Sequence, residues 1–172
     1  MLSFPQNIKP ILELIHEYSP QRILDIGGGM GKYALLIREQ ELSKKAEGGD
    51  MMPKSTIIID CNEDNPFFTN QVMHDKLYDN HYHKSAYNLK TPNNYDITLL
   101  IDVVEHWKKK ETKELLSKIN GLKLISTPKN TSMYDSHFYG DPRHHITQWS
   151  EKDFNTIIED ISTDLSHIFL IK

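Results

Sequence analysis

An aspartate followed by four closely spaced glycines is the part of this sequence best suited to holding a ligand. The stretch from Asp25 to Gly31 reads Asp-Ile-Gly-Gly-Gly-Met-Gly. Glycine adopts positive φ without strain and has no Cβ, so a glycine-rich turn allows the backbone to approach a bound molecule closely. We therefore predict a cofactor-binding turn made of Gly27, Gly28, Gly29 and Gly31. A glycine-rich turn without a ligand is the alternative.

The residues on either side of these glycines predict a strand, a tight turn and a helix. The residues from Ile23 to Ile26 form a short, largely apolar run, whereas Tyr33, Ala34 and Ile37 recur at helical spacing after the turn. A nucleotide-binding P-loop is excluded, because the turn lacks the Gly-Lys-Ser or Gly-Lys-Thr ending of that motif and an aspartate precedes its glycines.

The segment from Asp25 to Gly31 resembles the first motif of class I S-adenosylmethionine-dependent methyltransferases. In that family the glycine loop passes under the methionine part of the cofactor, and the strand acid helps to orient its ammonium group. The resemblance therefore implies that Asp25 belongs to the cofactor site. A carboxylate suits the positively charged sulfonium and ammonium groups of S-adenosylmethionine (SAM) better than it suits a pyrophosphate.

A second apolar run predicts the strand that carries the next cofactor residues. Residues 56–59 read Thr-Ile-Ile-Ile, which is typical of a strand buried on both faces. We expect Asp60 to end this strand, where Rossmann-like folds place an acid that accepts hydrogen bonds from both ribose hydroxyls. We include the adjacent Cys61 in the cofactor site and keep Glu63 and Asp64 as substitutes for Asp60.

A third strand is expected at residues 82–86, after a short helix at residues 72–77. In the methyltransferase pattern, an acid followed by alanine ends this strand and contacts the adenine amino group. Here the matching residues are Ser85 and Ala86. The resemblance therefore assigns the adenine contact to the Ser85 hydroxyl or to a backbone group.

The apolar run from Tyr95 to Val104 predicts a further buried strand that ends in a polar cluster. This strand places Asp102, Glu105 and His106 at the carboxyl edge of the sheet, on the same side as the glycine loop. A Tyr-Asp start, an apolar run and an acid-x-x-Glu-His ending also resemble the fourth strand of many methyltransferases. We assign Asp102 to the cofactor site on this basis.

The last third of the chain is expected to contain two helices, two strands and one long loop. These are a helix at 112–120 closed by Gly121, a strand at 122–126, a substrate-side loop at 127–149, a helix from Ser150 to Ile161 and an edge strand at 166–171. Ser150 and Asp153 have the spacing of a capping box. The loop is rich in aromatic and histidine side chains, including Trp149, so we interpret it as a flap over the acceptor site.

Methyl transfer from a sulfonium requires that donor and acceptor be held in line and that the acceptor lose a proton. His106, His144 and His145 are candidate bases, because the unperturbed pKa of histidine lies near physiological pH. A metal site is the alternative, and its ligands would be Asp102, Glu105, His106 and His145. This set resembles that of metal-dependent O-methyltransferases, including ubiquinone-pathway enzymes and small-RNA 3′-terminal 2′-O-methyltransferases. A divalent ion held there would bind and acidify a substrate hydroxyl.

The composition predicts one globular domain and excludes several classes of protein. The 172 residues are 38% hydrophobic and 26% charged, as in ordinary globular proteins. We find no apolar run of membrane-spanning length and no signal-peptide pattern, and so expect a cytoplasmic protein without a membrane partner. Cys61 is the one cysteine, which excludes an internal disulfide and a cysteine-built zinc site.

The charge distribution favours a small-molecule acceptor. The formal net charge is −4, which does not attract nucleic acid. We interpret the basic runs Lys44–Lys45 and Lys108–Lys110 as solvated surface rather than phosphate-binding patches. Nucleic acid is not excluded as an acceptor, and the oligomeric state stays open.

These patterns together predict an α/β protein with the three-layer Rossmann-like methyltransferase fold. Its central sheet is expected to be mostly parallel, with six or seven strands and helices on both faces. Within a single domain, residues 1–20 provide a leading helix, 22–126 the cofactor-binding core, 127–149 the substrate-side loop, and 150–172 a helix and an edge strand.

Three functions are compatible with this fold. The first is SAM-dependent methylation of an oxygen or nitrogen of a small molecule. A nicotinamide-dependent oxidoreductase is the second, but the glycines lack the G-x-G-x-x-G spacing and the chain has no Tyr-x-x-x-Lys motif. The third is a non-catalytic module that binds SAM without turnover.

Overall fold

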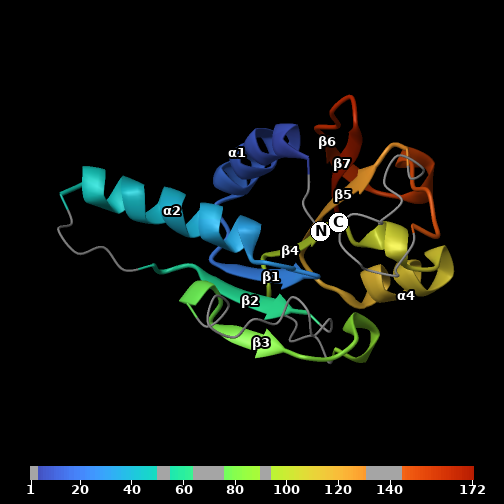
Figure 1. Cartoon of the computed structure of the whole chain (residues 1–172), viewed down its shortest axis with the longest axis horizontal. Helices are drawn as coiled ribbons and strands as arrows, with labels where there is room; N and C mark the ends of the chain where they lie inside the picture. The colour runs from blue at the N-terminus through green and yellow to red at the C-terminus, as the bar shows by residue number, and fades with distance from the viewer. Residues whose placement is uncertain (1–3, 50–54, 64–75, 90–93, 131–144) are drawn as a thin grey trace.

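In the computed structural model, which describes residues 4–49, 55–63, 76–89, 94–130 and 145–172, a single sheet is flanked by helices (Figure 1). The strands are β1 (Arg22–Ile26), β2 (Ile58–Asn62), β3 (Asn80–Tyr82), β4 (Ile97–Ile101), β5 (Leu122–Pro128), β6 (Ile157–Asp160) and β7 (Ser166–Ile171). The α-helices are α1 (Ile8–Tyr18), α2 (Lys32–Glu47) and α4 (Lys109–Lys118). The 3₁₀ turns are η1 (Pro5–Asn7), η2 (Ala86–Asn88), η3 (Val104–His106) and η5 (Glu151–Asp153).

The sheet has the order β3-β2-β1-β4-β5-β7-β6 among the described residues. The strands from β1 to β5 run parallel, and β7 is antiparallel to both β5 and β6. The carboxyl ends of the parallel strands therefore meet at one edge. Because β1 has β2 on one side and β4 on the other, the strand order reverses there, and α/β sheets bind ligands at such a point. The expected mostly parallel sheet is confirmed.

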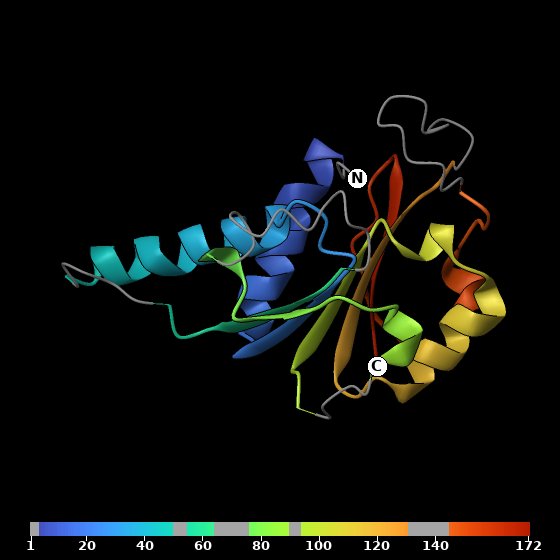
Figure 2. The same ribbon diagram turned by 60° about the horizontal axis from the view of Figure 1, so that its bottom comes forward.

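Each face of the sheet is covered by its own hydrophobic core. Ile23 and Leu24 are consecutive in β1 and point to opposite faces, as neighbours in a strand must. Ile23 packs in the core that contains Ile11 of α1 and Ile37 of α2, whereas Leu24 packs in the core that contains Leu115 of α4. Figure 2 shows α1 and α2 on one side of the twisted sheet and α4 on the other.

The leading helix is confirmed as α1, which ends where Ser19 takes a left-handed conformation with φ of 44°. None of the helices in the described ranges is both long enough and apolar enough to cross a bilayer.

The predicted helix from Ser150 to Ile161 is wrong. The capping box between Ser150 and Asp153 is formed, but it closes only the short turn η5, and the chain continues as β6. In β6, Ile157 is half-buried and Ile158 is exposed, an alternation expected of an edge strand rich in β-branched residues. Pairing with β7 therefore outweighs the local helical spacing, and β6 brings the sheet to seven strands within the described residues.

Several predicted boundaries also differ from the structure. The third strand, expected at residues 82–86, is β3 and spans Asn80–Tyr82. Helix α4 spans Lys109–Lys118 instead of 112–120. Most of the predicted helix at 72–77 and of the loop at 127–149 lies outside the described residues, and β5 takes the first two residues of that loop.

Gly121 was expected to close α4 but instead lies in the turn before β5. Its φ is +79°, and a Cβ there would lie 2.5 Å from the carbonyl oxygen of Tyr95. The turn needs glycine for this close approach between β4 and β5.

Candidate functional site

The glycine loop connects the end of β1 to the start of α2. Gly27, Gly29 and Gly31 have φ of +70°, +55° and +78°, so each uses the backbone freedom that the sequence pattern suggested. The loop is tied to the neighbouring strand, because the N–H of Gly27 donates to the carbonyl oxygen of Asn62 at 2.7 Å. Its conformation is therefore fixed by the sheet rather than by the helix alone.

Gly28 has no room for a side chain. A Cβ there would lie 2.5 Å from Tyr78 Oη and 3.0 Å from both Asp25 Oδ2 and Cys61 Sγ. The loop is thus packed tightly against three polar side chains behind it. Tyr78 comes from the segment before β3, and no sequence pattern indicated that it belongs here.

Asp25 lies behind the glycine loop with its side chain almost completely buried. Tyr78 donates a hydrogen bond from its hydroxyl to Asp25 Oδ2 at 2.7 Å. The pKa of Asp25 is raised to about 6: burial is the main cause, the Tyr78 hydrogen bond opposes it, and the charge of Glu63 adds to it. The acid of the first motif therefore supports the loop from within the protein.

Glu63, rather than Asp60, is the acid at the end of β2. The strand continues past Asp60, whose carboxylate accepts hydrogen bonds from the Tyr95 hydroxyl and, at 2.9 Å, from Asn80 Nδ2. Glu63 follows the strand directly, and its Oε2 accepts a hydrogen bond from the N–H of Gly29 at 3.1 Å. The expected strand end at Asp60 is wrong, because β2 continues through Cys61 to Asn62.

Cys61 and Ser85, two further residues of the predicted cofactor site, lie in different places. Cys61 is fully buried, and its Sγ would lie 3.0 Å from a Cβ at Gly28. Burial raises the pKa of its thiol, and the charges of Asp25 and Glu63 add to this effect. Ser85 lies beyond the end of β3, in the link to η2. Because β3 is parallel to β2, Ser85 and Glu63 both come after the carboxyl ends of their strands, at the same edge of the sheet.

Asp102 follows β4 directly and has an unusual backbone conformation. Its φ is +53°, in the left-handed region, and Ser126 Oγ donates a hydrogen bond to Asp102 Oδ1 at 3.1 Å. Burial raises the pKa of Asp102, whereas the Ser126 hydrogen bond and the charges of Lys32 and His145 lower it. Lys32 is the first residue of α2, so the carboxyl end of β4 lies near the glycine loop, as predicted.

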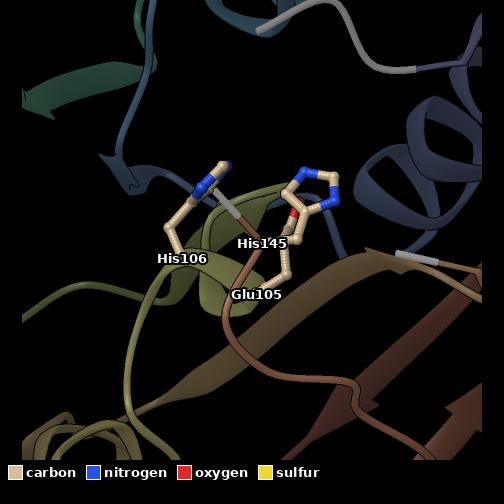
Figure 3. Close-up of side chains that lie close together, drawn as sticks. All are labelled: Glu105, His106 and His145. Atoms are coloured by element: carbon tan, nitrogen blue, oxygen red, sulfur yellow. The ribbon is translucent and has the colours of Figure 1, made fainter. Parts of the chain in front are cut away.

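Glu105, His106 and His145 converge at the same edge of the sheet (Figure 3). One ligand atom from each of these side chains lies within 4.8 Å of the other two, and the two imidazole rings have centroids 4.9 Å apart. His145 is placed by the backbone, because the N–H groups of Ile146 and Thr147 donate to the carbonyl oxygen of Glu105 at 2.9 and 3.1 Å. The predicted neighbours His106 and His145 are thus brought together, whereas His144 lies outside the described residues.

The carboxyl group of Glu105 is fully buried, and neither of its oxygens has a hydrogen-bond partner among the described residues. Burial raises its pKa well above the ordinary value, and the charge of Asp102 raises it further. A buried carboxyl group beside two imidazoles has the donor types that divalent transition metals bind, so these residues fit such an ion. They also fit a proton-transfer role without a metal.

Trp149 is not part of an exposed flap. Its side chain is fully buried, and its Nε1 donates to the carbonyl oxygen of Val104 at 3.0 Å and to Thr147 Oγ1 at 2.8 Å. The end of the predicted substrate-side loop is therefore anchored beneath η3, the turn that carries Glu105 and His106.

Solved structures with a similar fold include methyltransferases. The PH0226 protein from Pyrococcus horikoshii OT3 aligns with a TM-score of 0.68 at 10% identity, over 97% of this chain and 89% of that one. Magnesium protoporphyrin IX methyltransferase (ChlM) from Synechocystis PCC 6803 with bound SAM aligns with a TM-score of 0.64 at 12% identity, over 97% of this chain and 78% of that one. The methyltransferase domain of bacterial CtHen1-CN aligns with a TM-score of 0.61 at 14% identity, over 97% of each chain.

No protein-family model and no curated protein matches the chain in sequence. The likeness to solved structures, together with the sheet order and the glycine loop, shows that the chain has the class I methyltransferase fold.

Proposed function

We propose that this protein is a SAM-dependent methyltransferase that methylates an oxygen or nitrogen atom of a small-molecule acceptor. The observation that carries the proposal is the hydrogen bond from Gly29 to Glu63, which joins the acid at the end of β2 to the glycine loop. With three glycines at positive φ, this contact provides a carboxylate and an unobstructed backbone at the edge where α/β sheets bind ligands.

The cofactor residues have separate tasks in this proposal. Glu63 accepts hydrogen bonds from the ribose hydroxyls, because one carboxylate can serve two donors. The loop from Gly27 to Gly31 contacts the methionine part. Asp102 offers its carboxylate to the ammonium group, and Asp25 adds negative charge from behind the loop.

Two further residues shape the site less directly. Cys61 fills the space behind Gly28 and keeps the loop in place. The link after β3 follows the same edge as Glu63, so Ser85 is proposed to contact the adenine.

The chemistry then needs a proton acceptor close to the methyl group. When bound, SAM supplies a methyl group on a sulfonium for in-line displacement by the acceptor atom. His106 and His145 lie at the same edge as Asp102 and are the proposed bases; His144 stays a third candidate. Glu105, buried beside the imidazoles, favours the protonated form of the base when its own carboxyl group is ionised.

A metal-dependent O-methyltransferase is the second candidate, and the cluster of Glu105, His106 and His145 favours it. Here these residues, with Asp102, would hold a divalent ion that acidifies a hydroxyl group of the acceptor. Acceptors of the quinone type or the 3′ end of RNA belong to this alternative.

The test is the formation of S-adenosylhomocysteine by purified protein supplied with SAM and a panel of catechols, amines and short RNAs. We expect product with a small-molecule acceptor, unaffected by EDTA, and a loss of about 100-fold or more in His106→Ala or His145→Ala. His16→Ala, an exposed histidine of α1, is the matched control and should retain full activity.

The other outcomes discriminate between the alternatives. Activity that EDTA abolishes and Mg²⁺ or Mn²⁺ restores would support the metal-dependent enzyme instead. Binding of SAM without product from any acceptor would support a non-catalytic module. A wild-type protein that does not bind SAM would overturn the proposal.

A further inference from the structure

A buried polar network connects the N-terminal segment to the cofactor edge of the sheet. Asn7, at the end of η1, is fully buried, and its Nδ2 donates to Ser166 Oγ at 2.8 Å and reaches Ser126 Oγ at 3.5 Å. Its Oδ1 accepts a hydrogen bond from Thr163 Oγ1 at 3.0 Å. Both ends of the amide are therefore used, which fixes its orientation.

Asn7 occupies a position where asparagine ordinarily has a different task. It is the N-cap residue of α1, and asparagine is favoured there because its side chain can accept a hydrogen bond from the first turn of the helix. No such bond is formed in this protein. The side chain is directed into the network instead, which indicates that a contact other than helix capping determines the residue.

Ser126 of β5 links this network to Asp102. Its carbonyl oxygen accepts the N–H of Asp102 at 2.9 Å, and its hydroxyl donates to Asp102 Oδ1 at 3.1 Å. A hydroxyl has one hydrogen and an ionised carboxylate only accepts, so the Ser126 hydrogen points to Asp102 and its lone pairs face Asn7. The donors and acceptors thus form a directed chain from Asn7 through Ser126 to Asp102.

Asp102 is a residue that needs such support. Its φ of +53° lies in the left-handed region, which aspartate adopts more readily than most residues with a side chain but still at a cost in free energy, so surrounding contacts help to hold it. Ser126 holds both its backbone and its carboxylate. Since Asp102 follows β4 directly, the direction of its carboxylate at the sheet edge depends on these two hydrogen bonds with Ser126.

We propose that Asn7 is a positioning residue of the cofactor site, which acts through Ser126 to orient the Asp102 carboxylate. The inference rests on the proposed function for the role of Asp102 in binding SAM. It gives the segment before α1 a task in cofactor binding, although this segment is more than 90 residues before Asp102 in the sequence.

The first test is a double-mutant cycle on the dissociation constant for SAM. Asn7→Ala and Ser126→Ala should each weaken binding by about threefold to tenfold, the size of a net hydrogen-bond effect. In an Asp102→Ala background, neither substitution should weaken binding further, because both act through that carboxylate. Equal weakening in both backgrounds would overturn the inference.

Ile168→Val provides the matched control, because Ile168 pairs with Ser126 in the sheet and is equally buried. It loosens the same region without touching the network and should leave SAM binding unchanged. If Ile168→Val weakens binding as much as Asn7→Ala, the network acts only through general stability, and the inference fails.

A second measurement separates this inference from the proposed function. Amide hydrogen exchange at Asp102, followed by NMR in the protein without cofactor, should be faster in Asn7→Ala and Ser126→Ala than in Ile168→Val. Unchanged exchange overturns the inference even if wild-type protein binds SAM. If the two variants exchange faster but the wild-type protein binds no SAM, the proposed function and the cofactor role of Asp102 are overturned. The positioning of Asp102 by Asn7 and Ser126 then still stands.

Discussion

The carboxyl group of Asp25 is kept in an environment that favours its neutral form. Burial raises its pKa from the ordinary 3.8 to about 6, with a further contribution from the charge of Glu63. The folded protein therefore holds this proton up to a higher pH than the unfolded chain, so the ionisation of Asp25 lowers the free energy of unfolding as pH rises from about 4 to about 6. An acid kept at such a cost is typical of a functional position.

Asp25→Asn should increase stability at neutral pH while impairing the site. Asparagine can still accept the hydrogen bond from Tyr78 but never ionises, so we expect its free energy of unfolding at pH 7.5 to exceed that of the wild type by about 1–3 kcal/mol. The difference should disappear below about pH 4. Urea unfolding at both pH values checks this, and a wild type that gains stability relative to the variant with rising pH would contradict it.

Single residues were predictable where a local pattern fixes them. Gly27, Gly29 and Gly31 have the positive φ that their spacing suggested. The strand-end acid was misplaced by three residues, from Glu63 to Asp60, because β2 accommodates an acid in its interior. That acid is satisfied by Tyr95 and Asn80, which are distant in the sequence.

At the scale of elements, Trp149 holds η3 in place. Its ring is stacked on Phe154, with centroids 5.3 Å apart, and its Nε1 bonds the carbonyl oxygen of Val104. Since η3 carries Glu105 and His106, the packing of this one side chain supports the proposed proton-transfer or metal cluster.

Trp149→Phe should destabilise the protein by about 1–3 kcal/mol, because the Val104 carbonyl loses one of its donors, Thr147 Oγ1 loses the indole N–H, and a small cavity forms. Trp107→Phe is the matched control: Trp107 is only half-buried and packs against Tyr87 at the surface, so we expect a loss under about 1 kcal/mol. Urea unfolding of both variants measures the difference. Equal losses would show that the buried indole does not anchor η3.

Residues 150–161 show why secondary-structure elements were harder to predict than single residues within a motif. The spacing of Ile157, Ile158 and Ile161 suits a helix, and the capping box at Ser150 suits its start. The capping box does form, but the backbone of β7 has hydrogen-bonding groups along its edge that only a strand can pair with. A single sequence does not reveal which strand edge is left open for pairing.

At the scale of the whole molecule, the sheet follows from the sequence but much of the site does not. Continuous apolar runs located β1, β4 and β5, because parallel strands are buried on both faces. The contacts of Tyr78 with Asp25 and of Asn7 with Ser126 join segments far apart in the chain. Such pairs leave no local pattern, since each partner alone is an ordinary polar residue.

The central claim is that SAM binds at the edge where Glu63 meets the glycine loop. Calorimetric titration of SAM into wild-type protein, Glu63→Gln and Asp60→Asn tests it most directly, because the two carboxylates lie three residues apart on either side of the end of β2. We predict micromolar binding by the wild type, binding weakened about tenfold or more by Glu63→Gln, and binding within about twofold of wild type for Asp60→Asn. No binding by the wild type, or equal weakening by the two substitutions, would contradict the account.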